Sequence, residues 1–251
     1  MRVIAVAGKG GTGKTTLAVM VVRWLRDNRS KSILAVDADP ATNFADMLGV
    51  SAGESIGAVR EEMKTRGSDL PAGMTKQRFL EYKTQTGVIE TPHFDLIVMG
   101  RPEGPGCYCY ANNLLRDILD TLGKNYDYVV IDNEAGMEHL SRRTTRDVDH
   151  LLVVSLPTVT AIRTAGKISR VAGELAIGVK GKHLILNRMS GEPPEAVAKA
   201  IEADSLQLAG SIPEDDRLLS WDMAGTPLWP GLVDSEAYGR MGELLGRLIP
   251  G

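Results

Sequence analysis

Short apolar runs alternate with amphipathic stretches along most of the chain. The apolar runs are continuous, which is typical of strands buried on both faces of a parallel sheet. We predict strands at 2–7, 32–37, 94–100, 126–132, 150–156, 182–187 and 206–212. Apolar residues at helical spacing predict helices over 15–28, 112–125, 158–175, 193–203 and 235–249. The repeated strand–helix order predicts an α/β fold, a doubly wound and mostly parallel sheet with helices on both faces.

Residues 51–93 interrupt this order with polar helical pieces and loops. We expect one domain over residues 1–251, with 51–93 as an irregular helical excursion. The net charge of −3 gives no electrostatic footprint for nucleic acid. No apolar run approaches the length of about 20 residues that a transmembrane helix needs, and the N-terminus lacks the features of a secretory signal. We therefore expect a cytoplasmic protein with neither nucleic acid nor membrane as a partner.

The segment GKGGTGKTT, residues 8–16, follows the first predicted strand and opens the first predicted helix. It fits the P-loop pattern G-x-x-x-x-G-K-[ST], in which glycines let backbone N–H groups surround phosphate oxygens at a helix N-terminus. We expect Lys14 to reach the β- and γ-phosphates and the Thr15 hydroxyl to bind Mg²⁺. The residues expected around the nucleotide phosphates are Gly8, Gly10, Gly11, Thr12, Gly13, Lys14, Thr15 and Thr16.

Acidic residues stand at the ends of two predicted strands, where open α/β sheets bind ligands. Asp37 and Asp39 follow the second strand in VDADP. A carboxylate there could orient a water for attack on the γ-phosphate, although Asp37 could equally be a turn former or helix cap. Asp132 ends the strand YDYVVID, the usual place for the acidic group that holds Mg²⁺ through water.

The predicted strand at 182–187 indicates which base the nucleotide carries. LILNRM places Asn187 at the strand end, where its amide can hydrogen-bond an adenine edge. No NKxD sequence favours guanine. We therefore expect ATP.

The only two cysteines, Cys107 and Cys109, stand one residue apart in GPGCYCYANN. They could be inert buried thiols, a labile disulfide or metal ligands. Metal binding fits best, because Cys109 lies near the start of a predicted helix, where thiolates are favoured. Two subunits across a two-fold axis would supply four sulfurs, which suit Zn²⁺, Ni²⁺ or an iron–sulfur cluster. We expect structural or exposed positions, rather than metal-binding roles, for the scattered histidines His93, His139, His150 and His183, and only His139 is kept open as an exception.

The segment KGGTGKTT resembles the deviant Walker A motif of the MinD, ParA, ArsA and nitrogenase-iron-protein group of ATPases. The resemblance implies that ATP closes a homodimer in which Lys9, otherwise a solvated loop lysine, acts on the partner's nucleotide. It favours Asp39 as the catalytic base with Asp37 in support, and it places Glu134 and Gly136 in a switch segment. The residues that it places beside the base are Asn187, Arg188 and Pro213.

A narrower resemblance comes from MGRPEGPGCYCYANNLLR and VVIDNEAGMEHLSRRTTRDVDHLLVVS, which are similar to the CooC family. These are nickel-insertion ATPases that mature carbon monoxide dehydrogenase, and close relatives serve acetyl-CoA synthase. The resemblance implies a homodimer that binds Ni²⁺ through Cys107 and Cys109 of both subunits. It also implies slow ATP hydrolysis during delivery to the apo nickel enzyme. The family usually has valine where this chain has Thr12, and we expect that change to matter little.

Two other functions remain open at the level of the sequence. One is an iron–sulfur electron-transfer ATPase like nitrogenase iron protein, although the switch segment DNEAGMEHL has no cysteine. The other is a positioning ATPase of the MinD or ParA kind. A membrane-targeting helix is rich in Lys and Arg, whereas the helix at 235–249 has only Arg240 and Arg247. We predict that this helix packs on the sheet.

Overall fold

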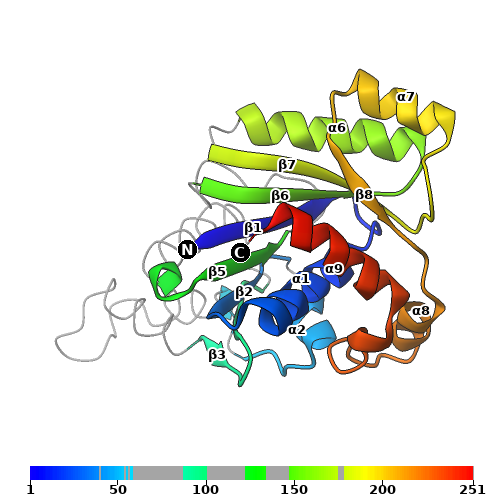
Figure 1. Cartoon of the computed structure of the whole chain (residues 1–251). Coiled ribbons are helices and arrows are strands. Elements are labelled where there is room, and N and C mark those ends of the chain that lie inside the picture. Colours follow the sequence, from blue (N-terminus) through cyan, green and yellow to red (C-terminus); the bar gives the residue numbers. More distant parts are fainter. Residues whose placement is uncertain are drawn as a thin grey trace, which may run out of the picture.

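The computed structural model describes residues 1–39, 41–53, 55, 57–58, 87–100, 122–133, 147–174 and 178–250. Its strands form one sheet of eight in the order β3-β4-β2-β5-β1-β6-β7-β8 (Figure 1). The strands are β1 (Arg2–Gly8), β2 (Ile33–Asp37), β3 (Ile89–Glu90), β4 (Asp95–Val98), β5 (Tyr128–Asp132), β6 (Asp147–Ser155), β7 (Gly178–Asn187) and β8 (Leu208–Ile212). Every pairing is parallel except that of β3 with β4. The predicted fold class is confirmed.

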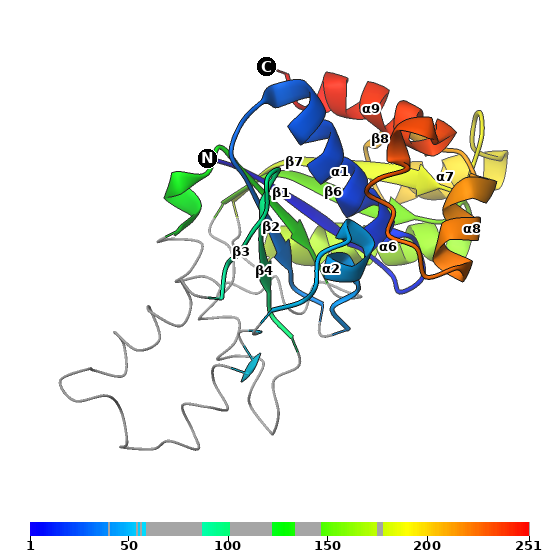
Figure 2. The same ribbon diagram turned by 90° about the horizontal axis from the view of Figure 1, so that it is seen from below.

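Helices cover both faces of this sheet (Figures 1 and 2). They are α1 (Lys14–Arg29), α2 (Asn43–Leu48), α6 (Val159–Glu174), α7 (Glu195–Ala203), α8 (Asp216–Met223) and α9 (Glu236–Leu248). Short 3₁₀ turns are η1 (Gly123–Asn125) and η2 (Leu232–Asp234). Alternate residues of β1 face opposite layers, with Ile4 and Val6 toward α1 and α9 and Val3 and Ala5 toward α6.

All seven predicted strands are present, and two of them begin earlier in the chain than predicted. β6 begins at Asp147 and β7 at Gly178. The first half of β7, GVKG, is only partly buried, so its pairing with β6 makes it a strand although it has no apolar run. Most of the predicted helix at 112–125 and of the excursion at 51–93 lies outside the described residues. β3 and α2 were not predicted, because each is too short to show a period. α8 was not predicted because it has no buried apolar stripe, since none of its residues is buried.

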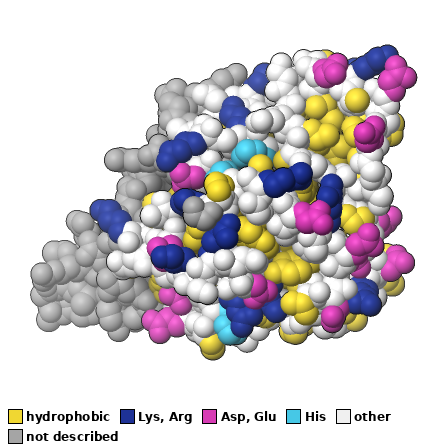
Figure 3. Space-filling view, in the orientation of Figure 1, with side chains coloured by type: hydrophobic (Ala, Val, Ile, Leu, Met, Phe, Trp, Pro, Cys, Tyr) yellow, Lys and Arg dark blue, Asp and Glu magenta, His cyan; other side chains and the backbone are white. Residues whose placement is uncertain are grey.

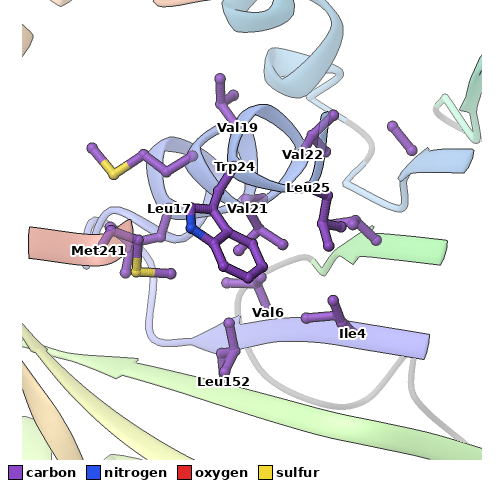
Figure 4. Packing of buried hydrophobic residues seen from close by; sticks show 14 of the residues in the cluster. Ile4, Val6, Leu17, Val19, Val21, Val22, Trp24, Leu25, Leu152 and Met241 are labelled. Atoms are coloured by element: carbon purple, nitrogen blue, oxygen red, sulfur yellow. The ribbon is translucent and has the colours of Figure 1, made fainter. Parts of the chain in front are cut away.

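Helix α1 is the centre of the larger core. Leu17, Val21 and Trp24 point toward β1, whereas Val19 lies on the opposite side of the helix (Figure 4). Val19 is nevertheless fully buried, because α2 and α9 also pack against α1. Residues 17–22 of α1 are buried at every position, and a helical segment that is apolar on all sides is stable only when it is enclosed in this way. The P-loop, whose last residues form the first turn of α1, is therefore attached to a well-buried helix.

Helix α9 packs on α1 and β8, as predicted from its sequence. Its N-cap is Ser235, whose hydroxyl accepts a hydrogen bond from the Tyr238 N–H at 3.1 Å. Its residues Met241, Leu244 and Leu245 are buried in the core. In the part of the chain that the structure describes, no helix combines the length and apolarity needed to cross a membrane.

Replacing Met241 with alanine tests the packing of α9. Met241 is completely buried, and truncating a buried methionine to alanine costs about 2–5 kcal/mol of unfolding free energy. Met223→Ala is the matched control, because Met223 is 81% exposed on α8 and surface changes cost within about 0.5 kcal/mol. Denaturant unfolding of both variants gives the comparison. Equal, small effects would contradict a buried α9.

Candidate functional site

The P-loop connects β1 to α1 at the centre of the sheet. Gly11 and Gly13 have φ angles of +79° and +90°, in the left-handed region that glycine adopts without strain. A Cβ at Gly8 would collide with the Val154 carbonyl of the neighbouring strand β6. The glycines of the motif are therefore required here by backbone conformation and close packing.

Inside the loop, the Lys9 carbonyl accepts hydrogen bonds from two side chains. The Thr12 hydroxyl donates to it at 2.8 Å and the Lys14 ammonium at 3.4 Å. Thr12 and Lys14 are buried, whereas Lys9 and Gly10 are exposed at the tip of the loop. Thr12 thus makes a contact that the sequence did not predict, and one that a valine could not make.

Asp37, at the end of β2, organises the turn that follows. Its carboxylate accepts hydrogen bonds from the Asp39 N–H at 3.1 Å and from the Phe44 N–H of α2 at 3.2 Å. Burial raises the pKa of Asp37 to about 7, against these two hydrogen bonds, which lower it. Of the two roles considered for this residue, the structure shows the one of turn former and helix cap. Asp39 is partly exposed, and it accepts a hydrogen bond from the Ala41 N–H at 2.9 Å.

Asp132 ends β5, in register with Val6 of β1 on one side and Asp37 of β2 on the other. Its side chain is buried, and neither carboxylate oxygen has a hydrogen-bond partner among the described residues. Burial, together with the nearby Asp37 carboxylate, raises its pKa to about 7. The Thr15 hydroxyl and the Lys14 ammonium are close enough to lower this pKa, but Thr15 does not reach hydrogen-bond geometry. An unpaired buried carboxylate is costly, so a bound cation beside it would be stabilising.

A magnesium ion fits this donor set. Mg²⁺ prefers oxygen ligands, keeps several waters and is commonly bound by one or two protein oxygens together with phosphates. Thr15 and Asp132 offer a hydroxyl and a carboxylate beside the P-loop. Across the described ranges, this site included, no group of three or more His, Cys, Asp or Glu side chains could hold a metal ion, so phosphate and water would complete the coordination.

Asn133 fastens the end of β5 to β1. Its backbone N–H and its side-chain amide both donate to the Val6 carbonyl, at 3.1 and 2.8 Å. Asn133 is 2% exposed. The sequence contains a signal for this contact, an asparagine directly after the acidic end of an apolar strand, but Asn133 was not among the predicted site residues. The contact restrains the backbone that carries Asp132.

A cavity of about 110 Å³ adjoins the P-loop on the side of α8. Asn187 and Arg188 reach it from the end of β7, and Pro213 reaches it from the end of β8. The Asn187 amide also donates to the Thr12 carbonyl at 2.8 Å, so it supports the P-loop as well as lining the cavity. The other lining residues include Thr16, Leu17, Met20, Leu218 and Leu219. The three residues expected beside the base are thus brought together next to the loop.

Cys107, Cys109, Glu134, Gly136 and His139 lie outside the described residues. The geometry that the structure shows therefore concerns the nucleotide side of the predicted site.

Replacing Asp132 with asparagine separates its cost to stability from its function. A folded-state pKa of about 7, above the unfolded value of about 3.9, means that the folded protein binds the proton more tightly. Protonation of Asp132 therefore stabilises the folded protein fully below about pH 4, and this stabilisation is lost as the pH rises toward about 7. At pH 8 without nucleotide, Asp132→Asn should raise the melting temperature by about 2–4 °C per kcal/mol of relieved cost.

The gain should vanish near pH 4, where both side chains are neutral, and differential scanning calorimetry measures it. The variant should also lose the additional stabilisation that Mg²⁺ gives to the nucleotide-bound protein. A lower melting temperature for Asp132→Asn at pH 8 would show that the carboxylate is already satisfied within the chain.

Comparisons with known proteins agree with this geometry. A family model described as the CobQ/CobB/MinD/ParA nucleotide binding domain matches residues 3–228. An uncharacterized ATP-binding protein of Methanocaldococcus jannaschii is 41% identical over 249 residues, covering 98% of each chain. The carbon monoxide dehydrogenase accessory protein CooC of Rhodospirillum rubrum is 34% identical over 268 residues, covering 98% of this chain and 97% of CooC.

Solved structures show the same fold at lower identity. A ParA family ATPase from Chlorobium tepidum TLS superposes with a TM-score of 0.73 and 19% identity, covering 96% of this chain and 97% of that one. MinD from Pyrococcus horikoshii OT3, complexed with Mg-ADP, gives a TM-score of 0.69 with 21% identity over 99% and 96% of the two chains. The chain therefore belongs to the CobQ/CobB/MinD/ParA nucleotide-binding domain family.

Proposed function

We propose that this protein is an ATP-hydrolysing, homodimeric metallochaperone that carries Ni²⁺ to an apo nickel enzyme. The client would be carbon monoxide dehydrogenase or acetyl-CoA synthase. The observation that carries the proposal is the 34% identity to CooC over nearly the full length of both chains, together with the Cys-x-Cys sequence at 107–109. The nucleotide part of the function follows from the family, and the nickel part is the proposal.

ATP would occupy the P-loop with its phosphates at the N-terminus of α1. The backbone N–H groups of the loop and the half-positive end of the helix favour the phosphate charge, and Lys14 would turn from the Lys9 carbonyl to the β- and γ-phosphates. The adenine would enter the cavity beside Asn187, Arg188 and Pro213. Bound Mg²⁺, held by Thr15 and through water by Asp132, would neutralise charge that develops on the phosphates.

Hydrolysis needs a water held in line with the γ-phosphate. Asp39 is the better candidate for orienting that water, because its carboxylate is partly exposed beside the loop, whereas that of Asp37 is buried and bonded to the backbone. Lys9 stands exposed at the loop tip. From there it would reach the nucleotide of a second subunit, so that ATP binding and dimer closure are coupled.

Nickel is the cargo rather than a resident cofactor. Cys107 and Cys109 of two subunits would supply four thiolates. Thiolates are soft ligands, and four of them suit a transition-metal ion such as Zn²⁺ or Ni²⁺. ATP can change the hold on the ion only through its different affinity for the two dimer states. The dimer would therefore retain the nickel ion in its closed state and release it after hydrolysis.

The positioning ATPases are a weaker fit to the described residues. MinD of Helicobacter pylori is 24% identical over 88% of this chain, and the likeness to solved MinD and ParA structures shows the fold alone. The C-terminal helix α9, where a membrane-targeting segment was considered, is packed into the core through Met241, Leu244 and Leu245. It is therefore unavailable for a membrane surface in this conformation.

The direct test is nickel binding by tag-free, reduced protein under anaerobic conditions. Equilibrium dialysis should give one Ni²⁺ per dimer, with thiolate charge-transfer absorption, in the presence of a non-hydrolysable ATP analogue. Cys107→Ser and Cys109→Ser should each weaken binding at least 100-fold, because each removes two of the four shared ligands.

Both serine variants should still bind ATP, which serves as the folding control. Metal-free wild-type monomers that bind ATP would refute the proposal and favour a positioning ATPase. Brown protein with iron and sulfide would favour the electron-transfer alternative.

A further inference from the structure

Two of the four histidines, which were expected to be structural or exposed rather than metal ligands, lie side by side. His150 on β6 and His183 on β7 have Nδ1 and Nε2, respectively, 3.3 Å apart. Their rings are nearly parallel, with an interplanar angle of 29° and centroids 5.5 Å apart. The two residues are 33 positions apart in the chain, and only the adjacency of β6 and β7 brings them together.

A glycine makes this approach possible. His150 is in register with Gly181 of β7, and His183 is in register with Leu152, two residues further along β6. A Cβ at Gly181 would lie 2.7 Å from the His183 Nε2 atom, closer than real side chains come. Because Gly181 has no side chain, the His183 ring can lie over it and face His150.

The distance between the two nitrogens suits a shared metal ion. Imidazole nitrogens bind Zn²⁺ at about 2.0–2.1 Å in tetrahedral geometry, which places two ligand nitrogens about 3.3 Å apart. The two rings could instead share one proton in a hydrogen bond; on metal binding that proton would move to the other nitrogen of its own ring, so that both rings stay neutral. Imidazole is a good ligand for Zn²⁺, Cu²⁺ and Ni²⁺.

Both rings are accessible and favour their neutral, metal-binding form. Each histidine is about half-buried, and histidine side chains reach the surface near β6 and β7 in Figure 3. Burial lowers the pKa of His150, as do the nearby charges of Arg2 and Lys180, while Asp149 opposes this shift. Burial and the charge of His150 lower the pKa of His183. The Lys180 ammonium is paired with the Asp149 carboxylate at 2.7 Å, which limits its repulsion of a cation.

We propose that His150 and His183 form a two-histidine site for a divalent transition-metal ion, with water completing the coordination. The site lies on the face of the sheet that α1 and α9 cover, because His150 is two and four residues before Leu152 and Val154 of that core and so shares their face of β6. His150 is in register with Ile4 and Val154 with Gly8, so the pair stands about 13 Å along the strands from the P-loop. It is thus separate from the nucleotide site and uses neither cysteine.

Zn²⁺ alone is the probe, titrated by calorimetry into Cys107→Ser/Cys109→Ser protein, so that thiols do not contribute. One ion per chain should bind. In this background His150→Asn and His183→Gln should each weaken Zn²⁺ binding at least tenfold, because each amide can occupy the place of the ring nitrogen but is a poor metal ligand. His93→Gln is the matched control and should change binding less than twofold, since His93 stacks on Trp229 and is remote from the pair.

Gly181→Ala gives a second, independent test. The added methyl group should push the rings apart and weaken Zn²⁺ binding at least tenfold with both histidines retained. Electron paramagnetic resonance with Cu²⁺ should show two nitrogen ligands in the parent protein and one in either histidine variant. Unchanged Zn²⁺ affinity in His150→Asn and His183→Gln, or no Zn²⁺ binding by the parent, would overturn the proposal. Neither result depends on the nickel function of the cysteines.

Discussion

The site depends on two carboxylates that the sheet buries side by side. Asp37 and Asp132 end neighbouring strands in register beside the P-loop. Burying a charged carboxylate costs free energy unless it is paired or hydrogen-bonded. Asp37 recovers part of this cost from two backbone N–H groups, whereas Asp132 has no partner among the described residues. The fold therefore places a carboxylate without a described partner beside a phosphate-binding loop, where a hydrated cation and a nucleotide would relieve its cost together.

Much of the fold could be predicted because strands that are buried on both faces must be apolar at nearly every position. β1, β2 and β5 are of this kind, and each was found within two residues of its bounds. The beginning of β7 could not be predicted, since the partly buried residues GVKG carry no such pattern. The two residues of β3 and the six of α2 are too few to show any period.

The site was predictable where its residues are neighbours in sequence, and not where the sheet brings them together. The P-loop pattern is local, and the structure places it between β1 and α1. The Asn187 bond to Thr12 spans 175 residues and that of Asn133 to Val6 spans 127. These contacts, and the pairing of His150 with His183, depend on the strand order, which the sequence does not specify. Asn187 was predicted because it resembles residues that contact the base, whereas its hydrogen bond to the P-loop was not predicted.

The most direct test of the central claim is the transfer of nickel itself. Radiolabelled Ni²⁺ would be loaded on the dimer under anaerobic conditions and mixed with apo carbon monoxide dehydrogenase, with ATP or with its non-hydrolysable analogue. The account predicts label in the enzyme, and enzyme activity, only with hydrolysable ATP. It also predicts that the Asp39→Asn protein binds ATP and nickel but does not deliver. Transfer at the same rate without ATP, or none to either carbon monoxide dehydrogenase or acetyl-CoA synthase, would contradict it.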